Sequence, residues 1–390
     1  MRASSMRWHR LLAVCALLVL SIHLLYVLRL NQLTSSHRGS LPSPKKSKLD
    51  HLKLGPAAGS GLPNRLQCEG SKALNRTHLH SPPSEGNAAG LETSFVTVFT
   101  VYNATSADSR ADSGMVSVGN ASYSKTQLAL SIMNVFVKFI EIVMPRSNVF
   151  ILTDPASTFH LQSDRVHIYP ISGDYDRNSL MLQRIKSYIA FLDARLLHLQ
   201  LNPNHKQNYI FTDSDIAVVG DLGSLFTDYS DFDVALTFRN NKNQPLNSGF
   251  IAVRGTHGAM SRAKIFLNEV LQVYSLKFIN ASRMLGDQLS LAWVVKSHIN
   301  MEGRKFSKSE TFLEKVGNAQ VLFLPCLMYN WTPPEGAGQF HGMPLDVKVV
   351  HFKGSRKRLM LESWNFFNST FDIDDMLCLV LMSGRTKYDF

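Results

Sequence analysis

The stretch Tyr209-Ile210-Phe211-Thr212-Asp213-Ser214-Asp215-Ile216-Ala217-Val218-Val219 decides the fold. Apolar, strand-forming residues lead into two carboxylates one residue apart, and apolar residues follow them. Side chains at i and i+2 of a strand point to the same face, so we expect Asp213 and Asp215 to converge at the end of a buried strand. Two carboxylates held that close repel each other unless a divalent cation lies between them. Their oxygen atoms suit Mn²⁺ or Mg²⁺, which leave coordination positions open for substrate phosphates.

Strands and helices alternate around this stretch. Residues 127–144 and 179–199 carry apolar side chains at helical spacing. Six β-rich runs are predicted strands: residues 95–102, 148–154, 166–169, 209–219, 233–238 and 249–253. This order predicts an α/β fold, Rossmann-like, with a mostly parallel mixed sheet and helices on both faces. Ligands of such sheets bind beyond the carboxyl ends of the strands, which is where the two aspartates fall.

The N-terminal region has a different character. Residues 11–28 form an apolar run preceded by three arginines, and its length fits the roughly 17–25 residues that cross a bilayer. A cleaved signal peptide is the alternative, but its apolar region is usually shorter and is followed by small residues at a cleavage site. We expect a cytoplasmic tail at 1–10, a transmembrane signal anchor at 11–28, a flexible Pro/Ser/Gly-rich stem at 29–92 and a luminal domain at 93–390.

Six Asn-x-Ser/Thr triplets indicate that the body of the chain faces the secretory lumen, because N-glycans are added there. They begin at Asn75, Asn103, Asn120, Asn280, Asn330 and Asn368. Together with the anchor and stem, they predict a single-pass type II protein of the Golgi membrane.

Charge and cysteine content exclude other classes. The net charge is +11, but residues 1–53 hold nine Lys/Arg and one Asp, so most of the excess lies outside the folded domain. A nucleic-acid partner is therefore not expected. The cysteines Cys15, Cys68, Cys326 and Cys378 include no Cys-x-x-Cys pair, which argues against structural zinc. One luminal disulfide is compatible with them, and its connectivity stays open.

Four motifs, in this order, resemble those of nucleotide-sugar glycosyltransferases with the GT-A fold, of the glycogenin-like type (family 8 and its neighbours, including family 77). The resemblance covers roughly residues 95–361. The motifs are Asp213-Ser214-Asp215, Asn247-Ser248-Gly249-Phe250-Ile251-Ala252-Val253, Gly286-Asp287-Gln288 and His351-Phe352-Lys353-Gly354-Ser355-Arg356-Lys357.

The resemblance implies a metal site and a donor site. Asp213, Asp215 and His351 would hold Mn²⁺ (or Mg²⁺) against the diphosphate of the donor, which the metal stabilises as a leaving group. An ordinary, partly buried histidine is the alternative for His351. The donor-binding residues would include Ser214, Gly354 and Lys357, the last supplying a fixed positive charge.

Three cations near the predicted helix 179–199 are further donor-binding candidates: Lys186, Arg184 and Arg177. The alternative for each is a solvated surface charge. Arg184 and Lys186 are two residues apart and cannot share a helical face, so at most one of them points into the site.

Asn247 and Asp287 are the catalytic candidates. The amide of Asn247 can donate to and accept from sugar hydroxyls, although Asn-Ser-Gly also suits a turn. Asp287 can bind hydroxyls of donor or acceptor, although Asp also suits a helix N-cap.

One departure from the family pattern leaves the donor sugar open. The family-8 motif continues Lys-Pro-Trp, whereas Arg358-Leu359 follow Lys357 here, so the aromatic stack is absent or comes from Trp364. The expected function is transfer of a sugar from a UDP-linked donor to a glycan or glycoprotein, and the resemblance implies retention of configuration. Two alternatives stay open: a haloacid-dehalogenase-like phosphatase, and a non-catalytic carbohydrate-binding protein on a transferase fold.

Overall fold

The computed structural model describes the chain from residue 92 onward, with gaps. The described residues are 92–101, 115–118, 121–161, 163–241, 243–281, 284–301, 304–332, 347–357 and 360–361. All of them lie in His51–Phe390, one of the two units into which the chain divides. The expected tail, anchor and all but the last residue of the stem lie outside the described residues, so these three assignments stay predictions.

A mixed sheet of eight strands forms the centre of this unit, in the order β10-β11-β8-β9-β6-β1-β4-β5. Strands β5, β4, β1 and β6 run parallel to one another, and β8 and β11 are also a parallel pair. Strand β9 is antiparallel to both β6 and β8, and β10 is antiparallel to β11. The predicted mostly parallel α/β sheet is therefore confirmed. The bounds are β1 Glu92–Val98, β4 Val149–Thr153, β5 Val166–Pro170, β6 Gln207–Thr212, β8 Val234–Phe238, β9 Leu246–Val253, β10 Phe312–Val316 and β11 Ala319–Pro325.

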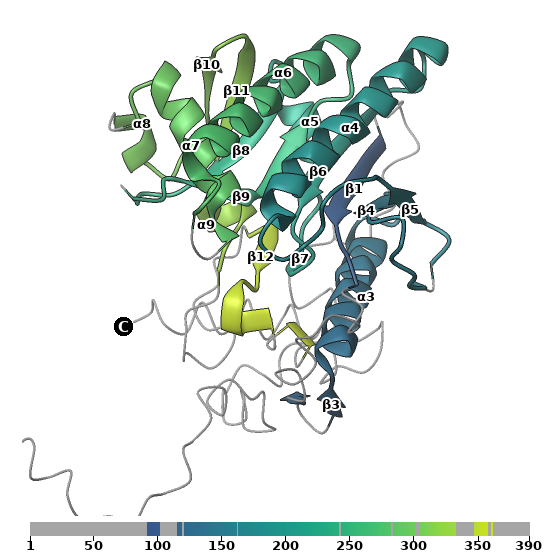
Figure 1. Ribbon diagram of the computed structural model, residues 1–390. Helices are drawn as coiled ribbons and strands as arrows, with labels where there is room; N and C mark the ends of the chain where they lie inside the picture. Colours follow the sequence, from purple (N-terminus) through teal and green to yellow (C-terminus); the bar gives the residue numbers. More distant parts are fainter. Residues whose placement is uncertain are drawn as a thin grey trace, which may run out of the picture. The chain divides into compact units, whose positions relative to one another are not determined.

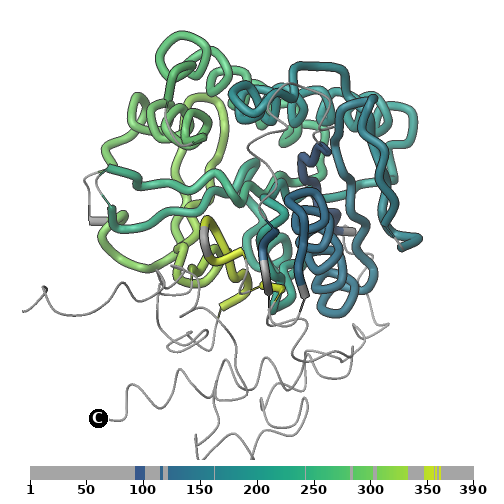
Figure 2. Tube along the Cα trace, turned by 60° about the horizontal axis from the view of Figure 1, so that its bottom comes forward, coloured from purple at the N-terminus to yellow at the C-terminus, as the bar shows by residue number. Residues whose placement is uncertain are grey.

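Helices lie on both sides of this sheet (Figure 1). α4 (Leu180–Leu201), α6 (His257–Val273) and α7 (Gly286–His298) cover one face, where they share a buried apolar core with the strands. Phe191 and Phe211 are fully buried there and pack edge to face. On the other side α3 (Lys125–Val143) packs against β7 (Ile216–Val218), and Figure 2 shows it apart from the other long helices.

α3 is, among the described residues, the helix that is long and apolar enough to cross a membrane. The core helix of a soluble protein passes the same test, and 44% of the apolar window of α3 is buried in this fold. It begins with a capping box, in which the Ser124 hydroxyl accepts from the Gln127 backbone N–H (3.2 Å) and the Gln127 amide oxygen accepts from the Ser124 N–H (2.8 Å).

Shorter elements complete the described part. They are β2 (Val116–Val118), β3 (Ala121–Tyr123), α5 (Ser224–Asp228), the π-helical turn η3 (Tyr274–Phe278), α8 (Arg304–Ser307), α9 (Cys326–Tyr329), β12 (Val349–His351) and the 3₁₀ turn η5 (Gly354–Arg356). Cys326 is a free thiol whose pKa is raised by burial, and the other three cysteines lie outside the described residues.

The expected single strand over 209–219 is wrong, because two strands occupy it. β6 ends at Thr212, residues 213–215 turn, and β7 then joins a separate two-stranded sheet with β12. The Asp213 N–H donates to the Gly249 carbonyl (3.3 Å), and the Asp215 carbonyl accepts from the Phe352 N–H (2.8 Å). The chain therefore leaves the central sheet between the two carboxylates, which converge through a turn and not through strand alternation.

Candidate active site

Asp213, Asp215 and His351 come together where β6 ends and β12 pairs with β7. In that pairing His351 stands opposite Ile216, directly after the aspartate turn. The His351 Nε2 atom lies 3.3 Å from Asp215 Oδ1 and 3.6 Å from Asp213 Oδ2. The three ligand atoms all lie within 4.8 Å of one another. His351 and Asp215 are buried, whereas the Asp213 side chain is 30% exposed and opens the cluster toward solvent.

This donor set fits a divalent cation. Two carboxylates and one imidazole match the oxygen and nitrogen ligands that Mn²⁺ accepts, and Mg²⁺ accepts the carboxylates. Burial raises the pKa of Asp215, but its interactions with His351 and with the Lys357 ammonium outweigh burial and lower that pKa well below its usual range. Asp215 is therefore an anion at neutral pH. Lys357 Nζ lies 3.2 Å from Asp215 Oδ2, and the charge of this carboxylate raises the pKa of Lys357.

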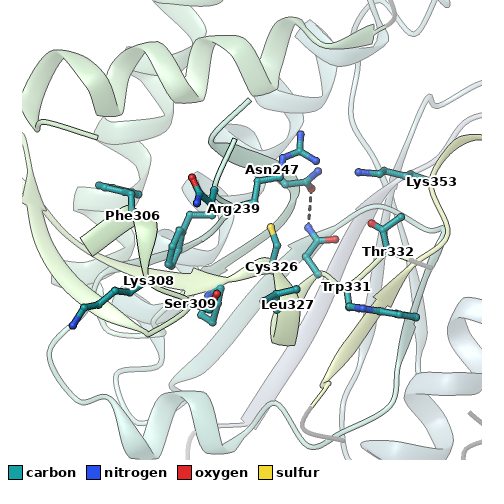
Figure 3. Close-up of a pocket in the computed structure, with 14 residues that line it drawn as sticks. Arg239, Asn247, Phe306, Lys308, Ser309, Cys326, Leu327, Trp331, Thr332 and Lys353 are labelled. Atoms are coloured by element: carbon teal, nitrogen blue, oxygen red, sulfur yellow. Dashed lines mark hydrogen bonds between the residues drawn. The ribbon is translucent and has the colours of Figure 1, made fainter. Parts of the chain in front are cut away.

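A chain of hydrogen bonds determines which nitrogen of His351 faces the aspartates. The Gly249 backbone N–H donates to Asn247 Oδ1 (2.8 Å), so that atom is an acceptor. Asn330 Nδ2 donates to the same oxygen (2.7 Å, dashed in Figure 3) and to Thr237 Oγ1 (3.2 Å). Asn330 Oδ1 therefore faces His351 Nδ1 at 2.7 Å and accepts its proton. Nε2 is left to present its lone pair between the carboxylates, the arrangement of a metal-binding imidazole.

Sequence reasoning missed this role of Asn330. The triplet Asn330-Trp331-Thr332 predicts a glycosylation acceptor, but Asn330 is only 4% exposed and its amide is engaged within the protein. Trp331 is also buried, and its backbone forms a parallel β-bridge with Val350. No local signal identifies Asn330, because its partners come from β9, β8 and β12. Of the other five triplet asparagines, Asn280 is exposed and the rest lie outside the described residues.

Arg184 is the cation of α4 that the structure brings into the site. Its guanidinium is buried and forms ion pairs with Asp213 and Asp287. Burial lowers the pKa of Arg184, but the two carboxylates outweigh burial and raise the pKa above its ordinary value. Lys186, two residues further along the helix, is exposed on another face. Arg177 is exposed in the turn before α4, so the structure brings neither of these two to the cluster.

The two catalytic candidates are both buried beside the cluster. Asn247 lies in β9 and not in a turn, and its Nδ2 donates to Gln288 Oε1 (3.2 Å). Asp287 lies in the first turn of α7, whose N-cap is Leu285, so Asp287 is not the capping residue. It holds Arg184 instead, which joins α7 to α4 across the site.

Gly249 permits the close approach of these groups. A Cβ atom at this position would lie 2.7 Å from Asp213 Oδ2, 2.7 Å from His351 Cε1 and 2.9 Å from Asn247 Oδ1. A side chain has no room at position 249, so the Asn-Ser-Gly motif requires glycine there.

The cluster opens into a pocket of about 610 Å³ at the carboxyl ends of β1 and β6. Its volume lies in the range of small-molecule sites, roughly 300–1,000 Å³. The sequence-predicted residues that line it are Arg184, Asp213, Ser214, Asp215, Asn247, Asp287, His351, Gly354 and Lys357. An anionic ligand here would meet Lys357 and a bound cation together, which suits a diphosphate.

Comparisons with known proteins add little to this geometry. No protein-family model matches the chain, and no curated protein matches it. Among solved structures, the chain is similar to a glycosyltransferase involved in the glycosylation of the major capsid of PBCV-1, at a TM-score of 0.36 and 10% identity, over 69% of this chain and 97% of that one. Function is therefore inferred from the site.

Proposed function

We propose that this chain is a metal-dependent glycosyltransferase with a GT-A-like domain. It would transfer a sugar from a UDP-linked donor to a glycan or glycoprotein. One observation carries the proposal: Asp213, Asp215 and His351 Nε2 converge, beside Lys357, at the floor of a pocket of about 610 Å³. Carboxylates packed this closely are stabilised by a cation, and a cation beside a lysine suits a nucleotide diphosphate.

The reaction breaks the bond between the anomeric carbon of the donor sugar and the diphosphate oxygen. A divalent cation at this site supplies Lewis-acid stabilisation of the departing diphosphate. Lys357 adds a fixed positive charge at the same end of the pocket. As the donor sugar gains oxocarbenium character, the acceptor hydroxyl oxygen bonds to its anomeric carbon. The hydroxyl proton passes to the leaving diphosphate. Retention of configuration is part of the proposal and rests on the motif resemblance.

Arg184, Asp287 and Asn247 would hold the sugar. Asp287 and Asn247 line the pocket, and both are fixed from behind, Asp287 by Arg184 and Asn247 by Asn330 and the Gly249 N–H. Polar groups fixed in this way orient a bound sugar at little entropic cost. Ser214 and Gly354 line the same pocket, and we assign them to the donor.

The cellular setting is proposed from the sequence. The apolar run at 11–28 and the glycosylation triplets outside the described residues support a single-pass type II protein of the Golgi membrane with a luminal domain.

The test is a panel of nucleotide sugars offered to the full-length chain with and without Mn²⁺. We expect Mn²⁺-dependent release of UDP from one donor, and its loss in Asp215→Asn. Asp228→Asn, an exposed aspartate on α5, is the matched control and should behave as the wild type. Turnover of a phosphate ester without turnover of any nucleotide sugar would establish the phosphatase alternative. Absence of Mn²⁺-dependent UDP binding would support the other alternative, a non-catalytic carbohydrate-binding protein.

A further inference from the structure

A second pocket adjoins the metal pocket. Its volume is about 330 Å³, and Asn247 and Lys353 line both pockets. Three aromatic residues line it, Phe238, Phe306 and Trp331. Figure 3 labels Phe306 and Trp331. This volume lies at the small end of ligand pockets and suits one sugar ring. Aromatic walls beside polar groups are what a sugar, with its apolar and hydroxylated faces, requires.

The charge of this second pocket is positive. Arg239, Lys308 and Lys353 line it, from the end of β8, the segment after α8 and the segment after β12, and none of its lining residues is acidic. In Figure 3 the Lys353 side chain points inward, toward Asn247. The metal pocket differs, because three aspartates line it together with its cations.

Arg239 and Lys353, the two half-buried cations, form no ion pair with a carboxylate in the described part of the chain, although the charge of Asp215 acts on Lys353 from beyond ion-pair distance. Arg239 donates from Nε to the Gln244 carbonyl (2.7 Å) and from Nη2 to Gln244 Oε1 (2.6 Å), so neutral oxygens hold its guanidinium in place. No ion pair is found for Lys353 among the described residues, and both side chains are half-buried. Lys308 is exposed, and its Nζ atom lies 3.8 Å from Glu310 Oε2. Excess positive charge in a concave, partly dry site attracts an anion.

We propose that the second pocket binds an acidic substituent, a carboxylate, sulfate or phosphate, on the sugar that accepts the transferred residue. The proposal rests on the proposed function, because the acceptor must lie beside the donor. The donor diphosphate has its own partners, Lys357 and the cation site, in the first pocket. Arg239 and Lys353 are then left for a second anion, and a guanidinium binds such oxyanions through paired hydrogen bonds.

Direct binding to the full-length chain, in the presence of Mn²⁺ and UDP, tests this inference. The probes are matched glycosides, para-nitrophenyl β-glucuronide against para-nitrophenyl β-glucoside and galactose 6-sulfate against galactose, measured by calorimetry. We expect the acidic member of at least one pair to bind about tenfold more tightly, the effect of a charge-assisted hydrogen bond. Arg239→Gln should remove that preference. Lys296→Gln, an exposed cation on α7 that lines neither pocket, should leave it unchanged.

UDP binding with Mn²⁺ is measured on the same samples and separates the two proposals. Normal UDP binding with equal affinity for the acidic and neutral glycosides would refute the proposed anion site in the second pocket and would leave the proposed transferase function unaffected. An acidic preference that depends on Arg239 without any UDP binding would support the anion site and overturn the transferase.

A carboxylate could also come from the donor, since some nucleotide sugars carry a uronic acid. UDP-glucuronic acid is therefore compared with UDP-glucose in the wild type and in Arg239→Gln. A preference for the uronic donor that needs Arg239, with no preference among the glycosides, would overturn the assignment to the acceptor.

Discussion

Replacing Asn330 by Ala would remove the side chain that orients His351. The variant loses the acceptor of the His351 Nδ1 proton at 2.7 Å, the bond to Asn247 Oδ1 at 2.7 Å and the bond to Thr237 Oγ1 at 3.2 Å. Asn247 Oδ1 keeps the Gly249 N–H. The main group left without a partner is therefore the Nδ1–H of a histidine that is 3% exposed.

The size of the effect follows from these contacts. A buried donor left unsatisfied costs about 1–3 kcal/mol, so the free energy of unfolding should fall by about that amount. Metal affinity should fall further, because the ring is free to turn and to move its proton to Nε2. Losing the partner of a metal-bound histidine typically lowers affinity 10- to 100-fold, which corresponds to about 1.4–2.8 kcal/mol of binding free energy.

The assay is Mn²⁺ titration of the full-length chain, with free Mn²⁺ followed by electron paramagnetic resonance and unfolding followed by circular dichroism. Asn330→Asp keeps an oxygen facing His351 but loses the donor to Asn247, and we expect it to retain more affinity than Asn330→Ala. Thr332→Ala destroys the glycosylation triplet and leaves the Asn330 side chain in place. It should bind Mn²⁺ as the wild type does.

Two results would refute this reasoning. One is Mn²⁺ affinity in Asn330→Ala equal to that of the wild type while His351→Ala abolishes binding. The other is a glycan on Asn330 of the folded wild-type protein, detected by mass spectrometry, since a side chain that is 4% exposed has no room for one.

Three further predictions concern Arg184, Gly249 and Tyr209. Arg184→Gln leaves the carboxylates of Asp213 and Asp287 without their buried partner, so the free energy of unfolding measured by urea titration should fall by about 3–5 kcal/mol. Lys186, on the same helix, is exposed, so Lys186→Gln should change the free energy of unfolding by less than about 0.5 kcal/mol. Gly249→Ala puts a Cβ atom 2.7 Å from both Asp213 Oδ2 and His351 Cε1, and should weaken Mn²⁺ binding in calorimetry with the circular dichroism spectrum preserved; an unchanged affinity would contradict the packing argument. Burial raises the pKa of Tyr209 to about 12, so the folded state favours the protonated phenol. The resulting stabilisation is complete below about pH 10. As the pH rises from about 10 toward 12, the free energy of unfolding should fall by about 2–3 kcal/mol. Tyr209→Phe should flatten that alkaline decline in unfolding measured from pH 9 to 12, and an identical decline in both proteins would refute it.

The strands and helices of the sheet were predictable because they depend on local patterns. The predicted helix over 179–199 is α4, Leu180–Leu201, and the predicted strand over 166–169 is β5, Val166–Pro170. Alternating or helical spacing of apolar side chains is readable within a window of a dozen residues. The proximity of Asp213 and Asp215 was likewise predictable, since one residue separates them.

The shape of the backbone between those aspartates was not predictable in the same way. A run that is apolar on both sides of Asp213-Ser214-Asp215 reads as one strand, but its second half pairs with β12 and not with the central sheet. Which partner a strand takes depends on segments far away in the sequence, so local propensity cannot decide it.

The choice between Arg184 and Lys186 shows the same division. Helical periodicity predicted that at most one of them could face the site. The rotation of α4 against the sheet decided that it is Arg184, because that face of the helix is buried against Asp213 and Asp287.

Sequence alone thus established the α/β alternation, the acidic pair and the list of candidate ligands, because each is encoded by neighbours in the chain. Only the packed structure decided that His351 reaches the acidic pair, that Asn330 holds it there, and that Arg239 and Lys353 share a second pocket. Those arrangements depend on strand pairing and burial between distant segments, where the free energy of packing selects one partner among many.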